Sequence, residues 1–266
     1  MAIITRDQYL TAKLGAQEIR ITKISSRTSV AASWTSLFDL AGSPGAGTLA
    51  GTSTTAGVVP TDADAGFPLI DAFAGGATGY LDVFEYSGTV AGRVRVSDCV
   101  WKGGAYNFNA AVTLSAQPSY ASRMPGGDYR GTQIWIEAVT AFTGNLTVEV
   151  TYTNQDGTAG RTTGAVATGV APILGRMLQL PLQAVDSGVQ KIESVTATVS
   201  SAGTFNVLVL RPLATGRVAQ AGGGDVFGIE KIDAPRVFAD SALFMTIAPD
   251  GTATGSPDVN LRIING

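Results

Sequence analysis

The chain has 266 residues, of which 45% are hydrophobic and 15% are charged, and its formal net charge is −3. This composition is typical of a globular chain that can bury one or two cores. Histidine is absent and Cys99 is the single cysteine, which excludes Ser–His–Asp and Cys–His catalysis, histidine-ligated zinc and an intrachain disulfide. Carboxylate-pair chemistry is the remaining formal route to catalysis. We therefore expect no enzymatic activity, no metal and no cofactor.

The first residues predict a short helix followed by one strand. Thr5 is a suitable N-cap with Gln8 three positions later, so we expect a helix over about residues 6–14. The next segment, EIRITKI at residues 18–24, alternates isoleucine with polar residues. That alternation is typical of a strand with one buried face.

Residues 1–33 are basic, whereas the rest of the chain is acidic. They carry five basic side chains and two acidic ones, which gives a charge of +3. Because the net charge of the chain is −3, the other residues together carry −6. An acidic body makes nucleic acid a poor partner, because such binding relies on phosphate neutralisation. We predict that an N-terminal arm, residues 1–40, docks on another protein; an ordinary solvated face is the alternative. The predicted docking residues are Arg6, Lys13, Ile19, Arg20, Ile21, Lys23, Ile24 and Arg27.

Residues 41–79 are mostly Gly, Ala, Ser, Thr and Pro, with too few large apolar side chains for a core of their own. This composition predicts an extended connector that either wraps over a neighbour or stays mobile. Within it, Gly42 and Gly47 have the spacing of a phosphate-binding loop, but Thr48 occupies the place of the required lysine. We therefore predict that the chain does not bind nucleotides.

Beyond Tyr80, short strand signals follow one another. Apolar and polar residues alternate in several segments, and the Asp-Gly pair at residues 156–157 predicts a hairpin. The glycine-rich stretch 219–228 is expected to be a flexible loop or a hairpin tip. The strand-like segments are 92–101, 133–139, 145–153, 161–166, 176–182, 189–199, 204–212, 242–249 and 258–264. This rhythm predicts an all-β fold, an antiparallel β-sandwich of jelly-roll-like type over residues 80–266.

No apolar run approaches the roughly 20 residues that a membrane-spanning helix needs. The start of the chain also lacks the basic and then apolar layout of a signal peptide. We expect a soluble chain that is made in the cytoplasm and has no membrane partner.

Four stretches of the chain, taken in order, resemble one protein family. They are SLFDLAGSPGAG, VSDCVWKGG, VEVTYTNQDGTAGRTTG and GRMLQLPLQAVDSGVQKIESVTAT, and the similarity runs over about residues 36–210. The family consists of virion structural proteins of tailed bacteriophages that are found among head-associated genes, mostly without assigned activity. Its markers in this chain are Trp101, the hairpin residues Tyr152, Thr153, Asn154, Gly160, Arg161 and Thr162, and the group Pro181, Leu182, Gln183, Asp186 and Gly188. These markers are structural, and none is catalytic.

The resemblance implies a virion structural protein, with a capsid decoration or cement subunit on the head surface as the leading interpretation. Its partner would be the major capsid protein or another virion protein, and it would form a homo-oligomer, with a symmetric trimer favoured. Two other functions stay open. One is a tail, collar or fibre-attachment component of the same virion. The other is a carbohydrate-binding or carbohydrate-cleaving module that uses Trp135, Tyr152 and paired carboxylates, which exposed aromatic side chains would favour.

Overall fold

The structure is a computed structural model that describes residues 3–141, 145–169, 173–198 and 202–266. Most regular structure in these residues is antiparallel β-strand, which confirms the predicted all-β sandwich class. The helical elements are α1 (Arg6–Leu14), α2 (Ile229–Ile232) and the short 3₁₀ turns η1 (Ala74–Gly76), η2 (Ala121–Arg123) and η3 (Pro125–Gly127). The predicted helix is confirmed with its cap: Thr5 and Gln8 form a reciprocal capping box.

The strands form three sheets, which we call the shared, middle and terminal sheets. The shared sheet consists, in spatial order, of β11 (Met177–Leu180), β7 (Gln133–Ala138), β13 (Thr204–Val218), β5 (Gly92–Asn107), β16 (Leu243–Pro249) and β2 (Thr35–Ser36). The middle sheet consists of β10 (Val166–Ala167), β8 (Thr147–Asn154), β12 (Val189–Ala197) and β6 (Ala111–Thr113), with β9 (Arg161–Thr162) paired to β8. The terminal sheet consists of β14 (Gly224–Gly228), β4 (Gly79–Gly88), β17 (Pro257–Asn265), β1 (Gln17–Lys23) and β3 (Gly42–Ser43), with β15 (Arg236–Val237) paired to β4.

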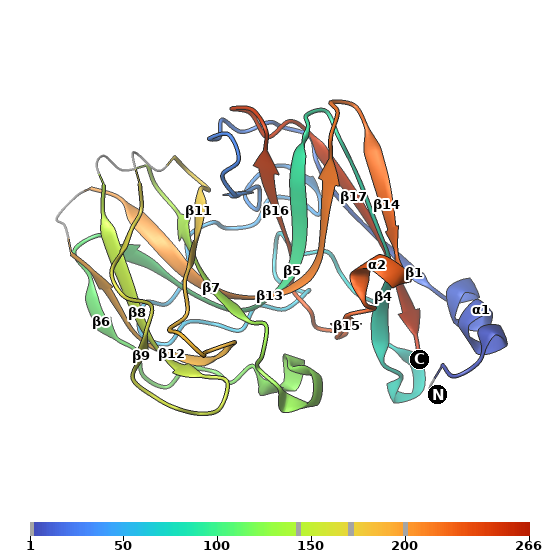
Figure 1. Cartoon of the computed structure of the whole chain (residues 1–266), viewed down its shortest axis with the longest axis horizontal. Coiled ribbons are helices and arrows are strands. Elements are labelled where there is room, and N and C mark those ends of the chain that lie inside the picture. Colours follow the sequence, from blue (N-terminus) through green and yellow to red (C-terminus); the bar gives the residue numbers. More distant parts are fainter. Residues whose placement is uncertain (1–2, 142–144, 170–172, 199–201) are drawn as a thin grey trace.

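The two long strands β5 and β13 run through both halves of the molecule and divide it into two lobes (Figure 1). One half of this strand pair packs against the middle sheet and forms the middle lobe with it, and the other half packs against the terminal sheet and forms the terminal lobe. The ladder between them has three register shifts, which lie between Phe205 and Val207, between Val209 and Leu210, and between Pro212 and Ala214. Such bulges bend and twist a strand, so they let one pair of strands serve two sandwiches.

Each lobe has its own apolar core, and a third cluster covers the opposite face of the shared sheet. The middle core contains Trp101, Tyr106 and Phe205; the terminal core contains Ile21, Phe84 and Leu261; the third cluster contains Phe38, Trp135 and Phe244. Successive side chains along much of β5 and β13 therefore point into two different apolar clusters, which explains why these strands are almost wholly buried.

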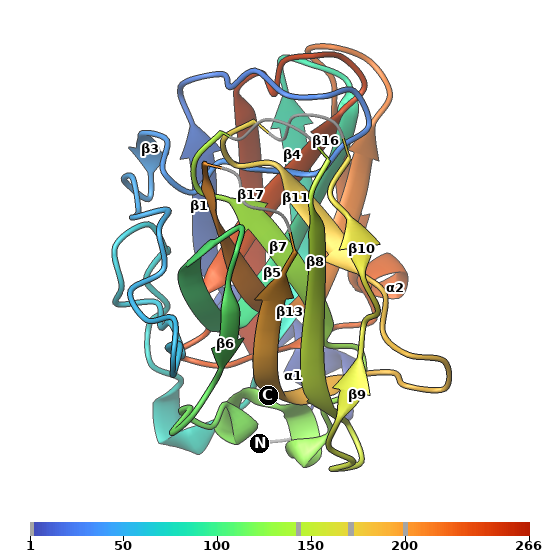
Figure 2. The same cartoon turned by 90° about the vertical axis from the view of Figure 1, so that its left-hand side faces the viewer.

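β1 lies inside the terminal sheet, between β17 and β3, and is not part of a detached arm. Ile19 pairs with Leu261 and Ile21 pairs with Val259, and both isoleucines belong to the terminal core. Figure 2 shows β1 beside β17, although these strands lie near opposite ends of the sequence. The predicted boundary at residue 40 is therefore wrong, because the first strand and the last strand form one ladder.

The connector, residues 41–79, packs on the shared sheet of the same chain. Leu49 and Phe67 are buried in the third cluster, and Val58 forms an isolated β-bridge with Lys102. Gly57 lies so close to the indole ring of Trp101 that a Cβ at this position would overlap the ring. The predicted boundary at residue 79 does not separate two structural units either, since the connector completes the third cluster.

The strands expected beyond Tyr80 are largely present, and the hairpin between β8 and β9 is confirmed by the pairing of Thr151 with Thr162. Val199, which closes the predicted segment 189–199, lies outside the described residues. The interpretation of 219–228 as a loop or hairpin tip is wrong for its second half, because Gly224–Gly228 is strand β14 paired with β4. Glycine lowers the local strand propensity, but an adjacent strand supplies the hydrogen bonds here.

Candidate functional site

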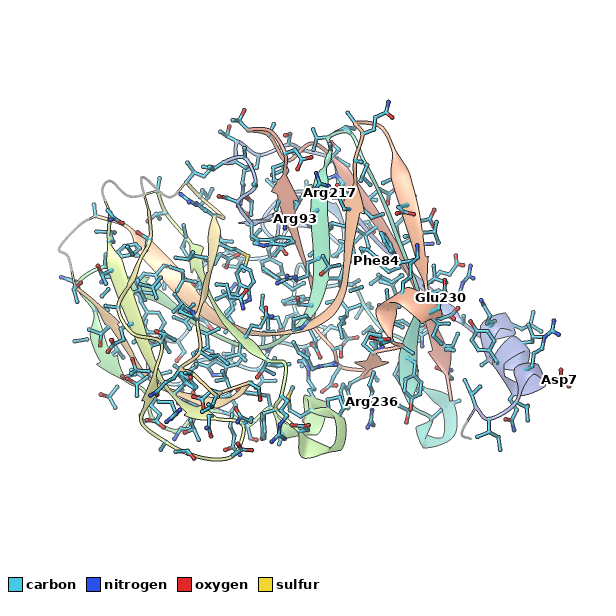
Figure 3. All side chains as sticks on the ribbon, viewed as in Figure 1. Asp7, Phe84, Arg93, Arg217, Glu230 and Arg236 are labelled. Carbon is cyan, nitrogen blue, oxygen red and sulfur yellow. The ribbon has the colours of Figure 1, made fainter. Side chains whose placement is uncertain are left out.

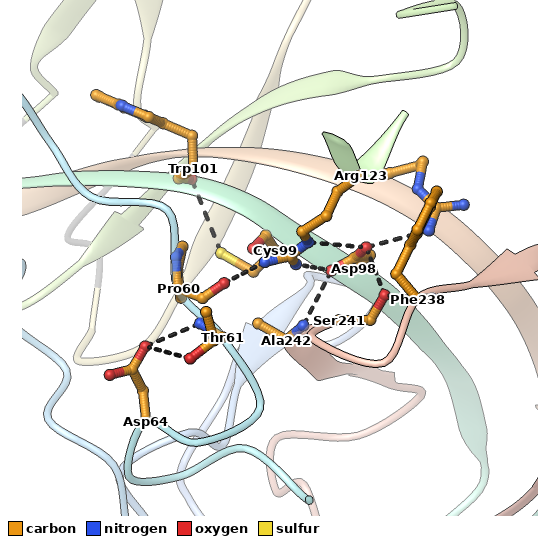
Figure 4. A network of polar contacts seen from close by, with 11 residues as sticks. Pro60, Thr61, Asp64, Asp98, Cys99, Trp101, Arg123, Phe238, Ser241 and Ala242 are labelled. Carbon is orange, nitrogen blue, oxygen red and sulfur yellow. Dashed lines mark hydrogen bonds and ion pairs between the residues drawn. The ribbon is translucent and has the colours of Figure 1, made fainter. Parts of the chain in front are cut away.

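A buried polar network lies where the two lobes meet, and it is centred on Asp98 of β5 (Figure 4). The Asp98 carboxylate is fully buried and pairs with the guanidinium groups of Arg123 and Arg211. It also accepts hydrogen bonds from the Ser241 hydroxyl at 2.9 Å and from the Ala242 backbone amide at 3.0 Å. The carboxylate is therefore surrounded by donors from the chain itself and is closed to an external substrate.

The two arginines tie separate segments to this junction. Arg123 donates to the backbone carbonyls of Pro60 in the connector and Cys99 in β5. Burial lowers the pKa of Arg123 to about 10, and burial together with the neighbouring Arg236 lowers the pKa of Arg211 to about 10. Both groups remain protonated at neutral pH, so the junction is a buried ion cluster that holds the lobes and the connector together.

The glycine-rich loop that resembles a phosphate-binding loop presents a backbone carbonyl group to a lysine side chain. The Lys102 ammonium donates to the Thr48 carbonyl at 3.2 Å and lies 4.9 Å from the centre of the Phe38 ring. The Gly47 amide is already used, because it donates to the Phe38 carbonyl at 2.9 Å. A phosphate cradle instead presents several free backbone amides to its ligand. This geometry gives a physical reason for the prediction that the loop does not bind nucleotides.

Other groups with chemical potential are enclosed in the core. Cys99 is fully buried, and burial raises the pKa of its thiol to about 12, so the thiol is neutral and inert. Glu137 is also fully buried; burial raises the pKa of its carboxyl group, which accepts a hydrogen bond from Asn206 at 2.8 Å. In the described part of the chain, no group of three or more acidic or cysteine side chains could hold a metal ion.

Three of the residues that carry the family resemblance donate hydrogen bonds to a fourth, Asp186. The Tyr152 hydroxyl and the Arg161 guanidinium each donate to Oδ2 of Asp186 at 2.8 Å or less, and the Asn154 amide donates to Oδ1 at 2.8 Å. The backbone amide of Gln183 donates in turn to the Tyr152 hydroxyl at 2.8 Å. Two parts of the resemblance that are separate in sequence thus form one hydrogen-bonded cluster, which fixes the 181–188 loop on β8 and β9.

The cluster favours the ionised form of Asp186, whose side chain is 1% exposed. Burial opposes ionisation, but the hydrogen bonds from Arg161, Asn154 and Tyr152 outweigh it and lower the pKa of Asp186 to about 2. Burial and the bond to Asp186 raise the pKa of Tyr152 to about 12. The sequence named every member of this cluster as a marker, but it gave no signal that they share one acceptor.

Replacing Asp186 by asparagine is expected to destabilise the middle lobe by about 1–3 kcal/mol, because the three donors that converge on this buried side chain lose their charged acceptor. A depressed carboxyl pKa stabilises the fold above the unfolded-state value of about 3.9, and this contribution disappears as the pH falls towards 2. The wild-type melting temperature should therefore drop more steeply than that of Asp186→Asn between about pH 4 and pH 2. Thermal melts followed by circular dichroism measure this, with Asp156→Asn at an exposed ion pair as the control. Parallel pH profiles for wild type and Asp186→Asn would contradict it.

The aromatic residues considered for carbohydrate binding lie inside the molecule. Trp101, Trp135 and Tyr152 are buried, and every other aromatic side chain in the described ranges is buried or half-buried. Sugar binding by a β-sandwich module uses exposed rings as a platform, so the carbohydrate alternative finds no such platform in the described residues.

Four of the eight predicted docking residues are used inside the chain. Ile19 and Ile21 are buried in the terminal core, and Ile21 is only 2% exposed. Lys23 is buried and donates to two backbone carbonyls, at 2.9 and 3.2 Å. Arg27 is buried and pairs with Asp39 at 2.6 Å. The docking role of these four residues is therefore wrong, because a contact with a partner requires side chains that the fold has not already consumed.

The other four docking residues reach the surface. Arg6 is exposed on α1, and Ile24 is 73% exposed just after β1. Arg20 is exposed and pairs with Asp258 at 2.6 Å. Lys13 is partly exposed and pairs with the buried carboxylate of Asp82. The structure does not bring these residues into one patch with the buried four, and their docking role stays a prediction.

α1 is held on the terminal sheet mainly by polar contacts. Asp82 of β4 is fully buried; the Tyr9 hydroxyl donates to it, and the Lys13 ammonium lies 3.3 Å from it. No residue of α1 is buried, and Leu10 and Leu14 are both exposed. A nine-residue helix is too short to be stable alone in water. The contacts to Asp82 therefore anchor a helix whose apolar side chains face outward.

No protein-family model matches the chain, and no curated protein matches it. Among solved structures, the infectious bursal disease virus VP2 subviral particle is 11% identical, covers 94% of this chain and 79% of its own, and has a TM-score of 0.19. The KI polyomavirus VP1 pentamer is 12% identical over 99% of this chain and 96% of its own, also with a TM-score of 0.19. The weak likeness is thus to proteins of viral particles, and TM-scores this low carry no argument about function. In the described residues, neither helix has the length and apolarity needed to cross a membrane.

Proposed function

We propose that the protein is a non-enzymatic structural subunit of a tailed-bacteriophage virion, acting as a decoration or cement subunit on the outer surface of the head. The observation that carries the proposal is the convergence of three marker residues, Tyr152, Asn154 and Arg161, on a fourth marker, Asp186. These markers form hydrogen bonds within the middle lobe, and Trp101 packs in its core. They build a framework for surfaces and do not arrange reacting groups around a cavity.

In this proposal α1 is the attachment element. Leu10 and Leu14 of α1 are exposed, Leu14 to 91%, as is Ile4 just before the N-cap of the helix, and Arg6 adds an exposed positive charge in the first turn. Burying these side chains on the shell would supply apolar transfer energy, and Arg6 would steer the subunit towards an acidic surface. The sandwich lobes would carry the contacts among like subunits, with a trimer as the proposed state.

The copy number of the protein in purified particles tests the location. Quantitative mass spectrometry against the major capsid protein should give several hundred copies per particle for a decoration subunit. Six or twelve copies would place it in the tail or neck instead, and absence from the particle would overturn the virion role.

The attachment element is tested by the double variant Leu10→Asp/Leu14→Asp. It should fold normally, because neither leucine is buried, but it should no longer bind particles that lack the wild-type protein. Val226→Asp, which also places a charge at an exposed apolar position, is the control and should bind. Equal binding of both variants would show that α1 is not the attachment element.

A further inference from the structure

Three arginines gather on one face of the shared sheet within the terminal lobe. Along β5, Arg93 and Arg95 alternate with Val94 and Val96, which belong to the terminal core, so the two guanidinium groups lie on the opposite face. Arg217 of β13 is the direct cross-strand partner of Arg93. Figure 3 shows Arg93 and Arg217 close together near the same end of these two strands. We call these three residues the arginine patch.

The charge of the arginine patch is not balanced within the described residues. Arg217 forms an exposed ion pair with Asp250 at 3.2 Å, but Arg93 and Arg95 pair with no carboxylate in the described part of the chain. Arg95 donates only to uncharged oxygens, such as Oε1 of Gln133 at 3.3 Å. Burial and the charge of Arg93 lower the pKa of Arg95. Like charges placed directly opposite each other destabilise an antiparallel pair, so this arrangement costs stability in the free protein.

The Trp34 ring orients the two unpaired guanidinium groups. Arg95 lies 4.7 Å and Arg93 lies 5.7 Å from the centre of this ring, which is half-buried and meets Trp135 edge-on at 6.4 Å. Stacking on an aromatic face restrains the plane of an arginine and leaves its N–H edge free to donate. Arg93 is exposed and can present its N–H edge to a partner, whereas Arg95 is half-exposed and its Nε and Nη1 already donate within the chain, which leaves Nη2 for a partner.

We propose that the arginine patch binds an extended acidic segment of a partner protein. Alternate residues of a strand are about 6.6–6.8 Å apart, and carboxylates at alternate positions of an extended segment have the same spacing. One such segment can therefore meet Arg93 through paired N–H···O bonds and Arg95 through Nη2. Nucleic acid fits less well, because its binding relies on neutralising several phosphates and the patch offers two arginines that pair with no carboxylate in the described residues. The inference goes beyond the virion role and does not depend on it.

The test uses the full chain and a fluorescent octapeptide in which threonine and glutamate alternate. A second peptide has the same composition but with the glutamates in one block, and an eight-nucleotide thymidine strand represents nucleic acid. Fluorescence anisotropy at low salt should show binding of the alternating peptide. The Arg93→Ala/Arg95→Ala variant should weaken it at least tenfold. Arg130→Ala, which removes another exposed arginine from the middle lobe, should leave it unchanged.

A stability measurement separates binding from a structural role. Because Arg93→Ala by itself removes the like charge opposite Arg217, the melting temperature of this single variant should equal or exceed that of the wild type. The proposal is overturned if the alternating peptide does not bind, or if Arg130→Ala weakens it as much as the double variant does. Equal or tighter binding of the block peptide or of the thymidine strand would also overturn it. Loss of binding together with a lower melting temperature would assign the patch to folding and would sink the proposal as well.

Discussion

Replacing Asp98 by asparagine is expected to remove about 3–5 kcal/mol of folding free energy, because it leaves two buried guanidinium groups without a counter-charge. Arg123 is fully buried, and the Arg211 side chain is 8% exposed, so water cannot replace the lost carboxylate without opening the junction. A domain of ordinary stability has about 5–15 kcal/mol in total. The variant should therefore lose a large share of its stability and unfold at a much lower urea concentration than the wild type, as measured by tryptophan fluorescence.

Two controls define the meaning of this result. Asp258→Asn removes a carboxylate from the exposed pair with Arg20 and should cost less than about 1 kcal/mol. Arg123→Met leaves the pair between Asp98 and Arg211 intact, so it should cost less than Asp98→Asn. If Asp98→Asn costs no more than Asp258→Asn, the junction is not the ion cluster that joins the lobes.

Deleting residues 1–33 is expected to unfold the terminal lobe. The deletion removes β1 from between β17 and β3 and takes Ile19 and Ile21 out of the terminal core. Burial of these two side chains contributes on the order of 3–6 kcal/mol, and the backbone groups of β17 would lose their partners as well. Size-exclusion chromatography and hydrogen exchange should show an expanded chain with rapid exchange in β4 and β17.

The shorter deletion of residues 1–15 is the matched control. It removes α1, which has no buried residue, and exposes Asp82 to water, where the carboxylate can be hydrated. This variant should keep a cooperative unfolding transition within a few degrees of the wild type. A folded, cooperative protein after removal of residues 1–33 would mean that β1 is dispensable and that the first strand is an appended arm after all.

Elements that depend on residues close together in the chain could be predicted from the sequence. The capped helix over residues 6–14 depends on Thr5 and Gln8, which are neighbours in the chain and form their hydrogen bonds within one turn. The hairpin between β8 and β9 depends on the turn residues between those strands. Periodicity in steps of two also identified most strands and the all-β class, because one buried face requires it.

The candidate site was predictable only in its parts. The four side chains of the cluster could be named from the sequence. That Asp186 is the common acceptor for the other three appears only when β8, β9 and the 181–188 loop meet. Asp98 gave no sequence signal as the centre of a network. Its partner Arg123 lies in a short 3₁₀ turn that no hydrophobic pattern marks.

The sequence by itself determined the class of the fold, the capped helix, most of the strands and the absence of histidine chemistry. The tertiary structure alone decided that Ile19 and Ile21 face the chain's own core, because the pairing of β1 with β17 joins residues more than two hundred positions apart. A strand's alternation shows that it has a buried face, but not which surface covers that face. The basic residues 1–33 therefore suggested a docking arm from the sequence, whereas long-range pairing placed the strand Gln17–Lys23 inside the terminal sheet.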